Sequence, residues 1–318
     1  MAAYAFNILL FPGLLFGLLM GLVFTGVDRK VVARMQRRIG PSVVQPFYDT
    51  VKLFAKETVI PARAPSDLFA GAPVIALAAS VTILLFIPIG NEPIFANAGD
   101  MVVILYLLAI PAVCSIVAGS ASGSSFSSVG LSREMVLMIA CEIPIAVSLV
   151  AAGIFVGKGQ GTGIVLSLSD IAKYQLDQGP LLLQWKLWPA VLGFLLTLPG
   201  EAGKVPFDLA EAETEICEGI MVEYGGRNLA VFQLAQGVKM FALIGLFVAL
   251  FTHGFLSIEG NTGYGALGFV LKCLAVLLIC ISWVRASVAR IKIEQAVKYF
   301  WTYPLGLSLL SLVLVWLF

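Results

Sequence analysis

The acidic stretch EAGKVPFDLAEAETEICEGIMVEY, from Glu201 to Tyr224, holds seven carboxylates and a single cation, Lys204. Like charges at this density raise one another's pKa, so some of the carboxyls can stay protonated near neutral pH and exchange protons. Pro206 suits the first turn of a helix, and such a helix would gather four acids at i, i+3, i+7 and i+10 on one face. These four are Asp208, Glu211, Glu215 and Glu218, and the other three acids are Glu201, Glu213 and Glu223. A solvated acidic face is the alternative interpretation.

Four further ionisable residues lie within or at the mouth of long apolar segments, namely Glu134, Glu142, Lys239 and Lys272. An ionisable side chain inside a membrane span is costly, which makes it a functional candidate by default. A lysine at such a depth either pairs with a carboxylate or gives up its proton, and both states suit a proton relay. Two structural alternatives stay open: Glu142 can be hydrogen-bonded between helices, and the lysine stems can reach a membrane surface.

The composition is that of a polytopic membrane protein. Of the 318 residues 59% are hydrophobic and 12% are charged, against roughly 25% charged in soluble domains. The mean hydropathy is +0.97. The five cysteines are scattered and the only histidine is His253, so we expect no iron–sulfur or haem site in this chain. A net charge of +1 gives no reason to expect nucleic acid as a partner. We interpret the apolar N-terminus as a first span rather than a removable signal.

We expect an all-α fold of one domain over residues 1–318, with about eight spans. They lie near 7–27, 68–90, 101–121, 135–156, 187–200, 229–252, 264–284 and 301–318. Of the 20 Lys and Arg residues, 15 follow the odd-numbered spans. The positive-inside rule therefore predicts both termini outside and four cytoplasmic loops. These loops are 28–67, 122–134, 201–228 and 285–300.

Two of these loops carry basic residues that can meet partners. In the first loop, a helix from Pro46 has apolar and charged faces, typical of an amphipathic helix in the membrane interface. The residues ahead of it, Arg34, Arg37 and Arg38, can bind lipid phosphates or dock an acidic partner. In the last loop, Arg285 and Arg290 can meet the acidic stretch, lipid headgroups or a soluble subunit.

Four stretches together resemble one family of membrane subunits. They are DRKVVARMQRRIGPSVVQPFYDTVKLFAKE, REMVLMIACEIP, EAGKVPFDLAEAETEICEGIMVEYGG and RASVARIKIEQAVKYFW. In this order they resemble the membrane subunit called H or 1 of respiratory complex I and the corresponding subunit of energy-converting membrane-bound NiFe hydrogenases. The resemblance implies a connector without catalytic residues or metal of its own. Its partners would be peripheral iron–sulfur and large hydrogenase-like subunits, which hold the clusters and any NiFe centre, and antiporter-like membrane subunits.

By position, the resemblance makes Glu142 and the seven acids of the acidic stretch part of a charged path for ions, with Arg34, Arg37 and Arg38 beside a redox chamber. Three departures weigh against quinone binding. Quinone-reducing members usually read E-T-N-R where this chain has Glu201 to Lys204, and A-E-Y where it has Ala235-Gln236-Gly237. Their last loop also differs, at Ala289 and 292–294.

The departures favour the hydrogenase-like branch, with its sulfur-reducing relatives. The leading expectation is therefore a membrane anchor that couples ferredoxin oxidation to H⁺ or Na⁺ pumping. The alternatives are a complex I subunit that encloses a quinone and, more remotely, a stand-alone ion transporter. Against the transporter stands the lack of an inverted repeat in the sequence.

Overall fold

The computed structural model describes residues 7–62, 64–90, 93–95, 101–161, 163–253 and 262–317. Residue 63 of the expected first loop and residue 318 of the expected last span lie outside them. The described chain is helical and contains no strand, which confirms the all-α prediction. The α-helices are α2 (Leu14–Met35), α3 (Gln45–Ala55), α4 (Ser66–Phe86), α5 (Met101–Ser122), α6 (Ser125–Gln160), α7 (Leu168–Gln178), α8 (Trp188–Glu201), α9 (Glu213–Ile216), α10 (Gly226–Phe251), α11 (Thr262–Val276), α12 (Trp283–Ser287) and α13 (Ile293–Leu317).

Seven helical segments of the described chain are long and apolar enough to cross a membrane. They are Asn7–Met35, Ser66–Phe86, Met101–Ser122, Ser125–Gln160, Gly226–Phe251, Tyr264–Ser287 and Ile293–Leu317. The other expected span, 187–200, is α8, a helix of 14 residues. At 1.5 Å per residue it is ~21 Å long, which is short of a hydrocarbon core of ~30 Å. Two 3₁₀ turns, Leu181–Leu183 and Trp185–Leu187, precede it.

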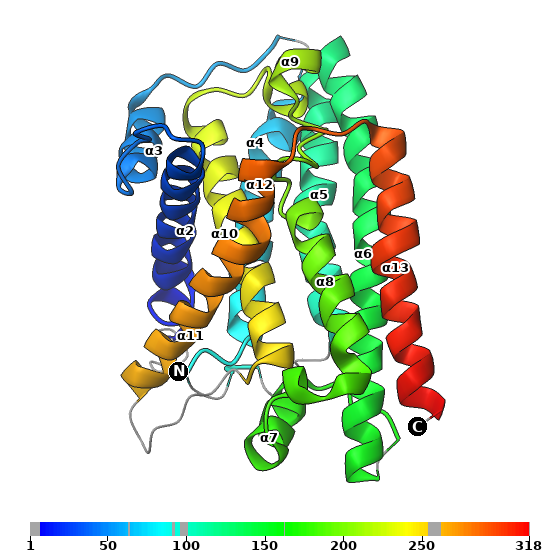
Figure 1. Cartoon of the computed structure of the whole chain (residues 1–318). Coiled ribbons are helices and arrows are strands. Elements are labelled where there is room, and N and C mark those ends of the chain that lie inside the picture. Colours follow the sequence, from blue (N-terminus) through cyan, green and yellow to red (C-terminus); the bar gives the residue numbers. More distant parts are fainter. Residues whose placement is uncertain are drawn as a thin grey trace.

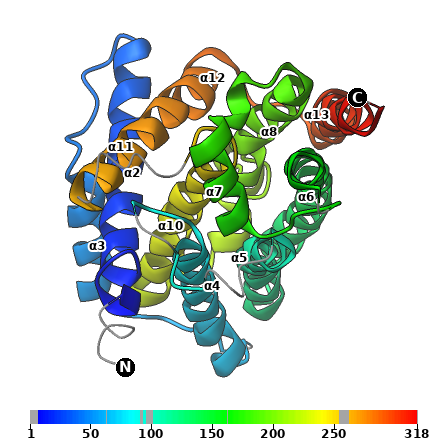
Figure 2. The same ribbon diagram turned by 90° about the horizontal axis from the view of Figure 1, so that it is seen from below.

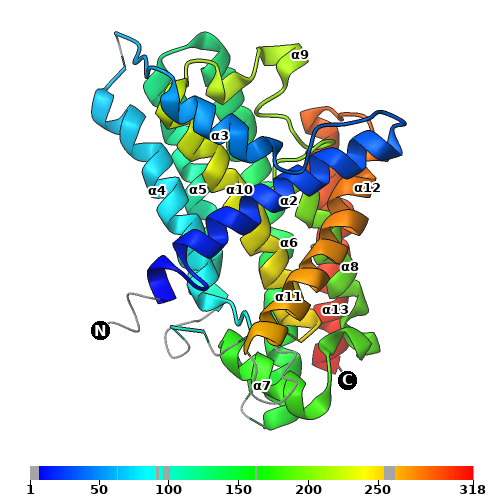
Figure 3. The same cartoon turned by 90° about the vertical axis from the view of Figure 1, so that its left-hand side faces the viewer.

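Helix α10 lies at the centre of the bundle, where it packs against α2, α3, α4 and α11 (Figures 2 and 3). Its side chains are apolar almost all round and almost all buried, as expected for a helix surrounded by others. The crossing with α2 is close, because a Cβ on Gly21 would lie 2.7 Å from the backbone of Gly237. Small residues at such crossings let membrane helices approach each other.

The loops gather by charge at one end of the bundle. Figure 1 shows α3, α9 and the link from α12 to α13 at one end, with α7 at the other. The start of α2 and the end of α13 both lie at the α7 end. The predicted acidic and basic loops thus share the end that carries α9, which we call the acidic end. The side of the membrane that this end faces stays a prediction.

The expected helix from Pro206 through Glu218 is wrong. Helix α8 ends at Glu201, and only α9 and a 3₁₀ turn, Gly219–Met221, form farther along the acidic stretch. The backbone adopts left-handed φ angles of 61° at Gly203, 70° at Glu218 and 50° at Gly219. A right-handed helix cannot include such residues. The four acids spaced for one helical face therefore do not share a helix, although Asp208, Glu211 and Glu218 line one cavity.

Helices also extend into two of the expected loops. Helix α6 begins at Ser125, after a break at Gly123, so most of the expected loop 122–134 forms its first turns. Helix α2 continues to Met35 and includes Asp28. The expected amphipathic helix is α3, with Val51 and Phe54 exposed, as an interfacial helix requires.

Candidate functional site

An ion pair between α8 and α10 lies at the heart of the candidate site. The Lys239 Nζ and the Glu201 Oε1 are 2.7 Å apart, and their side chains are 12% and 2% exposed. Glu201 is the last residue of α8, where the helix dipole disfavours a negative charge. Lys239 offsets both this repulsion and the cost of burying the carboxylate. Of the alternatives left open by the sequence, Lys239 therefore pairs with a carboxylate, and its partner is Glu201.

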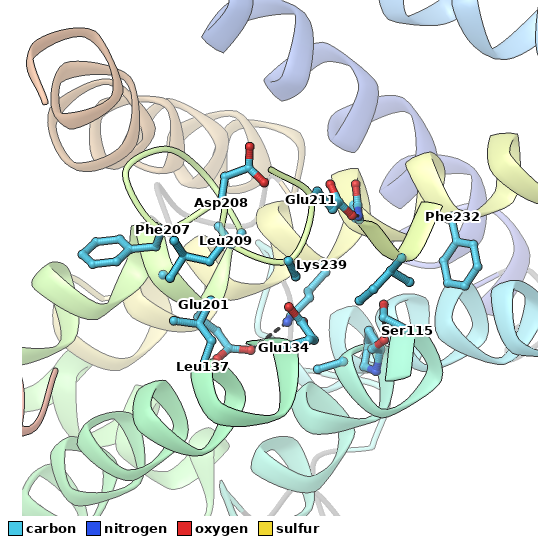
Figure 4. A pocket seen from close by; sticks show the side chains of 18 of the residues that line it. Ser115, Glu134, Leu137, Glu201, Phe207, Asp208, Leu209, Glu211, Phe232 and Lys239 are labelled. Atoms are coloured by element: carbon cyan, nitrogen blue, oxygen red, sulfur yellow. Dashed lines mark hydrogen bonds and ion pairs between the residues drawn. The ribbon is translucent and has the colours of Figure 1, made fainter. Parts of the chain in front are cut away.

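A cavity of about 70 Å³ opens beside this pair. It is lined by carboxylates from α6, α8 and the acidic stretch, and we call it the inner cavity (Figure 4). Its ionisable residues are Glu134, Glu201, Asp208, Glu211 and Lys239. A water molecule needs about 10–15 Å³ of such space, so the cavity has room for several. Figure 4 shows Lys239 pointing towards Glu201, with Glu134 beside them.

A second cavity, of about 190 Å³, leads from the inner one towards the acidic end. The two cavities share Asp208, Glu211, Phe232 and Gln236, and the outer one adds Glu213 and Glu218 from the acidic stretch with Gln233 from α10. The Gln236 Nε2 donates a hydrogen bond of 2.6 Å to the Glu211 Oε1. This bond lies where the cavities meet, so polar groups continue from the exposed acids to Lys239.

Glu211 is poised to exchange a proton near neutral pH. Burial, with repulsion from Asp208 and Glu134, raises the pKa of Glu211 to about 7, although the hydrogen bond from Gln236 and the charge of Lys204 oppose the rise. The sequence predicted such a shift from crowding of the acids. In the structure burial is the larger cause, because this carboxyl turns into the bundle.

Four acids of the acidic stretch are exposed at the surface: Glu213, Glu215, Glu218 and Glu223. Arg133 of α6 forms an ion pair with Glu215. Arg290 of the last loop binds the Asp208 Oδ2 at 3.1 Å. The basic loop thus meets the acidic stretch, one of the partners foreseen for it. These pairs hold the acidic stretch against α6 and the start of α13.

Asp28 was not among the residues predicted from the sequence. It is 1% exposed in α2 and accepts a hydrogen bond of 2.8 Å from the Ser282 Oγ. Arg285 forms an ion pair with the same carboxylate. Its acidic partner is therefore Asp28 of α2 and not a residue of the acidic stretch. Lys204 is near both groups: burial lowers its pKa, and the nearby Asp28 carboxylate opposes that effect. The sequence offered one signal for this site, because Asp28 is an acid directly before the basic residues Arg29 and Lys30.

A third, basic cavity of about 380 Å³ lies beside Asp28. It is lined by Arg29, Arg38 and Arg285 with apolar residues from α2 and the following loop. Arg29 also pairs with Asp49 of α3 at 3.2 Å. Arg34 and Arg37 are exposed nearby in the chain and do not line this cavity. Only Arg38 of the three predicted arginines therefore faces it.

Two predicted path residues stand apart from the inner cavity. The Glu142 side chain does not line it, and its buried Oε1 has no hydrogen-bond partner among the described residues. Glu142 still lies within the electrostatic reach of Glu201 and Lys239. The Lys272 Nζ donates to the carbonyls of Thr252 and His253 at 2.8 Å each. These carbonyls end α10 at the opposite end of the bundle, so the structure does not bring Lys272 to the other charges.

No group of three or more His, Cys, Asp or Glu side chains within the described ranges is arranged to hold a metal ion. Cys114, Cys141 and Cys273 are buried singly, and Cys217 is exposed. The chemistry available to the site is therefore that of carboxyls, the Lys239 ammonium group and the amides of Gln233 and Gln236, around cavities with room for several water molecules. Such groups transfer protons and bind cations.

Comparisons with known proteins agree with this architecture. The family model described as NADH dehydrogenase matches residues 8–316. The H subunit of the NADH-quinone oxidoreductase of Brevibacillus brevis is 32% identical over 317 residues, covering 95% of this chain and 90% of the relative. That of Geobacillus kaustophilus is 34% identical over 328 residues, covering 97% and 93%.

Among solved structures, a chain of the membrane-bound sulfane sulfur reductase, an archaeal respiratory membrane complex, superposes with a TM-score of 0.89. The two chains are 28% identical, and the match covers 99% of this chain and 100% of the other. Such matches extend over nearly the whole chain, including the acidic stretch and the helices around the inner cavity. This multi-pass membrane chain therefore belongs to the NADH dehydrogenase family, as the H/1-type membrane subunit of complex I-like and membrane-bound sulfur reductase or hydrogenase-type complexes.

Proposed function

We propose that this subunit anchors a cytoplasmic iron–sulfur redox module and couples its electron transfer to H⁺ or Na⁺ pumping by antiporter-like membrane subunits. The observation that carries the proposal is that two acid-lined cavities share a wall, and that the inner one is lined by the buried Lys239–Glu201 pair. Burying these charges is costly. Stability alone gives little reason to keep a buried ion pair, whereas transfer of protons through the bundle requires such groups.

In this proposal protons enter from the acidic end and pass along the shared wall of the cavities. Glu211 takes up and releases a proton near pH 7, its pKa being raised to about 7 by burial. Water in the inner cavity connects it to Glu134 and Glu201. Lys239 stabilises whichever of these carboxyls is ionised. Glu142 receives the proton next. Its buried Oε1 has no hydrogen-bond partner among the described residues and is open to a new one.

The redox module would dock at the acidic end, where the basic loops also lie. With this end in the cytoplasm, the positive-inside rule is obeyed. The exposed Arg34, Arg37 and Arg38 supply positive charge for an acidic docking partner or for lipid phosphates. The antiporter-like subunits would contact the apolar outer faces of the bundle.

The second candidate is a subunit that encloses a quinone, since the similar curated proteins are named as the H subunit of NADH-quinone oxidoreductase. Against it stand the departures at Lys204 and Gln236. Gln236 binds Glu211 instead of supplying a second carboxyl. Gly237 is packed against α2, where a Cβ would lie 3.2 Å from the Gly21 carbonyl oxygen. We expect activity to persist in quinone-depleted membranes and quinone-site inhibitors to have little effect. A quinone headgroup bound in the basic cavity would favour the second candidate instead.

The proposal is tested by exchanging Glu211 for a residue of the same shape that cannot titrate. Ion uptake and electron flow are measured in vesicles that contain the whole complex with Glu211→Gln. We expect fewer ions per electron, or a fall in both rates where coupling is tight. Glu223→Gln is the matched control, because Glu223 is an exposed acid of the same stretch that lines neither cavity. Equal ratios in both variants and the wild type would refute the proposed path.

A further inference from the structure

Gln236 is the one residue of α10 besides Phe232 that lines both cavities, and it shares this place with Asp208 and Glu211. Glu134, Glu201 and Lys239 line the inner cavity only, and Glu213, Glu218 and Gln233 line the outer one only. Because Glu211 also lines both cavities, the hydrogen bond from the Gln236 Nε2 to the Glu211 Oε1 lies at their junction. The donor–acceptor distance of this bond is 2.6 Å.

We propose that Gln236 is a positioning residue that fixes the Glu211 carboxyl at the junction of the cavities and sets the pH at which it exchanges its proton. The inference rests on the proposed function, which it deepens by assigning the control of proton exchange to one amide. An amide has no proton to lose at neutral pH. Its N–H groups donate to a carboxylate more favourably than to a carboxylic acid.

The surroundings of Glu211 explain why one donor matters. Acids face it from its own loop (Asp208), from α6 (Glu134) and from the outer cavity (Glu213 and Glu218). The opposing cations are Lys204 and Lys239, while Arg290 is engaged with Asp208. Burial and the acids favour the protonated form of Glu211, and Gln236 is the one side chain that hydrogen-bonds the ionised form among the described residues. Removing this donor should move proton exchange to higher pH.

A glutamate in place of Gln236 would have a different effect. Two carboxyls at the 2.6 Å separation of the present hydrogen bond cannot both ionise without strong repulsion, so they would share one proton and titrate in two separated steps. Gln236 instead leaves Glu211 as a single acid with one titration near neutral pH. The chain thus carries an amide where quinone-reducing members resembling it usually have an acid.

The test compares Gln236→Leu and Gln236→Glu in the intact complex, with Gln233→Leu as the control from the same helix. The Glu211 titration is followed as the infrared carboxyl band that disappears in Glu211→Gln. We expect Gln236→Leu to raise the midpoint by about one pH unit or more, the effect of losing one hydrogen bond to a charged group. Gln236→Glu should broaden the titration into two steps, and Gln233→Leu should leave it unchanged.

A Glu211 band that titrates at the wild-type pH in both Gln236 variants would overturn the positioning role, even where turnover falls. Should Gln236→Leu fail to assemble, the closely isosteric Gln236→Glu decides alone. A two-step titration of the Glu211 band would support the positioning role, and a one-step titration at the wild-type pH would overturn it. The proposed function is refuted separately, by normal ion uptake per electron in Glu211→Gln. The Gln236 variants can shift the titration of the Glu211 band while Glu211→Gln retains normal ion uptake per electron. That combination would support the role of Gln236 in setting the pH of proton exchange at Glu211 and would refute the proposed ion path.

Discussion

Replacing Lys239 with methionine should destabilise the subunit more than replacing its partner Glu201 with glutamine. Lys239→Met would leave the Glu201 carboxylate, which is 2% exposed at the C-terminus of α8, without its cation. Removing one member of a buried pair costs about 3–5 kcal/mol. Glu201→Gln should cost less, because Lys239 is 12% exposed and retains Glu134 beside it on the wall of the same cavity.

The double variant Lys239→Met/Glu201→Gln should recover most of the loss, since replacing a buried pair by neutral groups of similar size is often close to neutral. A double-mutant cycle on the purified complex in detergent measures this, with unfolding followed by tryptophan fluorescence. We expect an interaction energy of about 3 kcal/mol or more, at the top of the range for residues in contact. Additive costs, with no recovery in the double variant, would refute the claim that Lys239 compensates Glu201. The double variant should nevertheless fail to pump, because both exchangeable groups are gone.

Two further variants separate structural charges from functional ones. Lys272→Met removes two hydrogen bonds to the end of α10 and should cost about 1–2 kcal/mol, as for a cation at a helix C-terminus, with a normal ratio of ions to electrons. A lowered ratio in stably assembled vesicles would return Lys272 to the path. Charge reversal of the exposed Arg37 and Arg38 should release the redox module, most readily at raised salt, because exposed charges are screened. Undiminished co-purification in high salt would leave lipid contact as their role.

The helical membrane fold followed from the sequence because long apolar segments leave few other structures open to a chain. The shortest of the eight expected spans is 187–200, which forms the 14-residue helix α8. The course of the acidic stretch could not be predicted. Its acids have helical spacing, but left-handed residues such as Gly203 and Glu218 turn the chain and send Glu211 inwards. The acids are also held by Arg133 of α6 and Gln236 of α10, and no spacing in the sequence relates these residues to their partners.

The pairing of charges was predicted in part. Arg290 meets Asp208 of the acidic stretch, as expected. Asp28 was missed because its partner Arg285 lies far away in the chain, and no periodicity relates them. Lys272 was expected in the ion path because an ionisable residue deep in a membrane span is a functional candidate by default. Its Nζ instead donates to the backbone carbonyls at the end of α10. The sequence shows that a charge is buried but not what it touches.

The most direct test of coupling through the membrane concerns Glu142, the acid beyond the inner cavity. Glu142→Gln keeps the shape and hydrogen-bonding capacity of the side chain but cannot exchange a proton. Electron flow and ion uptake are measured in the same vesicles, after assembly and cofactor content are shown to be those of the wild type. We predict a lower number of ions per electron, with slower turnover where coupling is tight. A normal ratio at normal turnover would contradict the path and assign Glu142 to packing between helices.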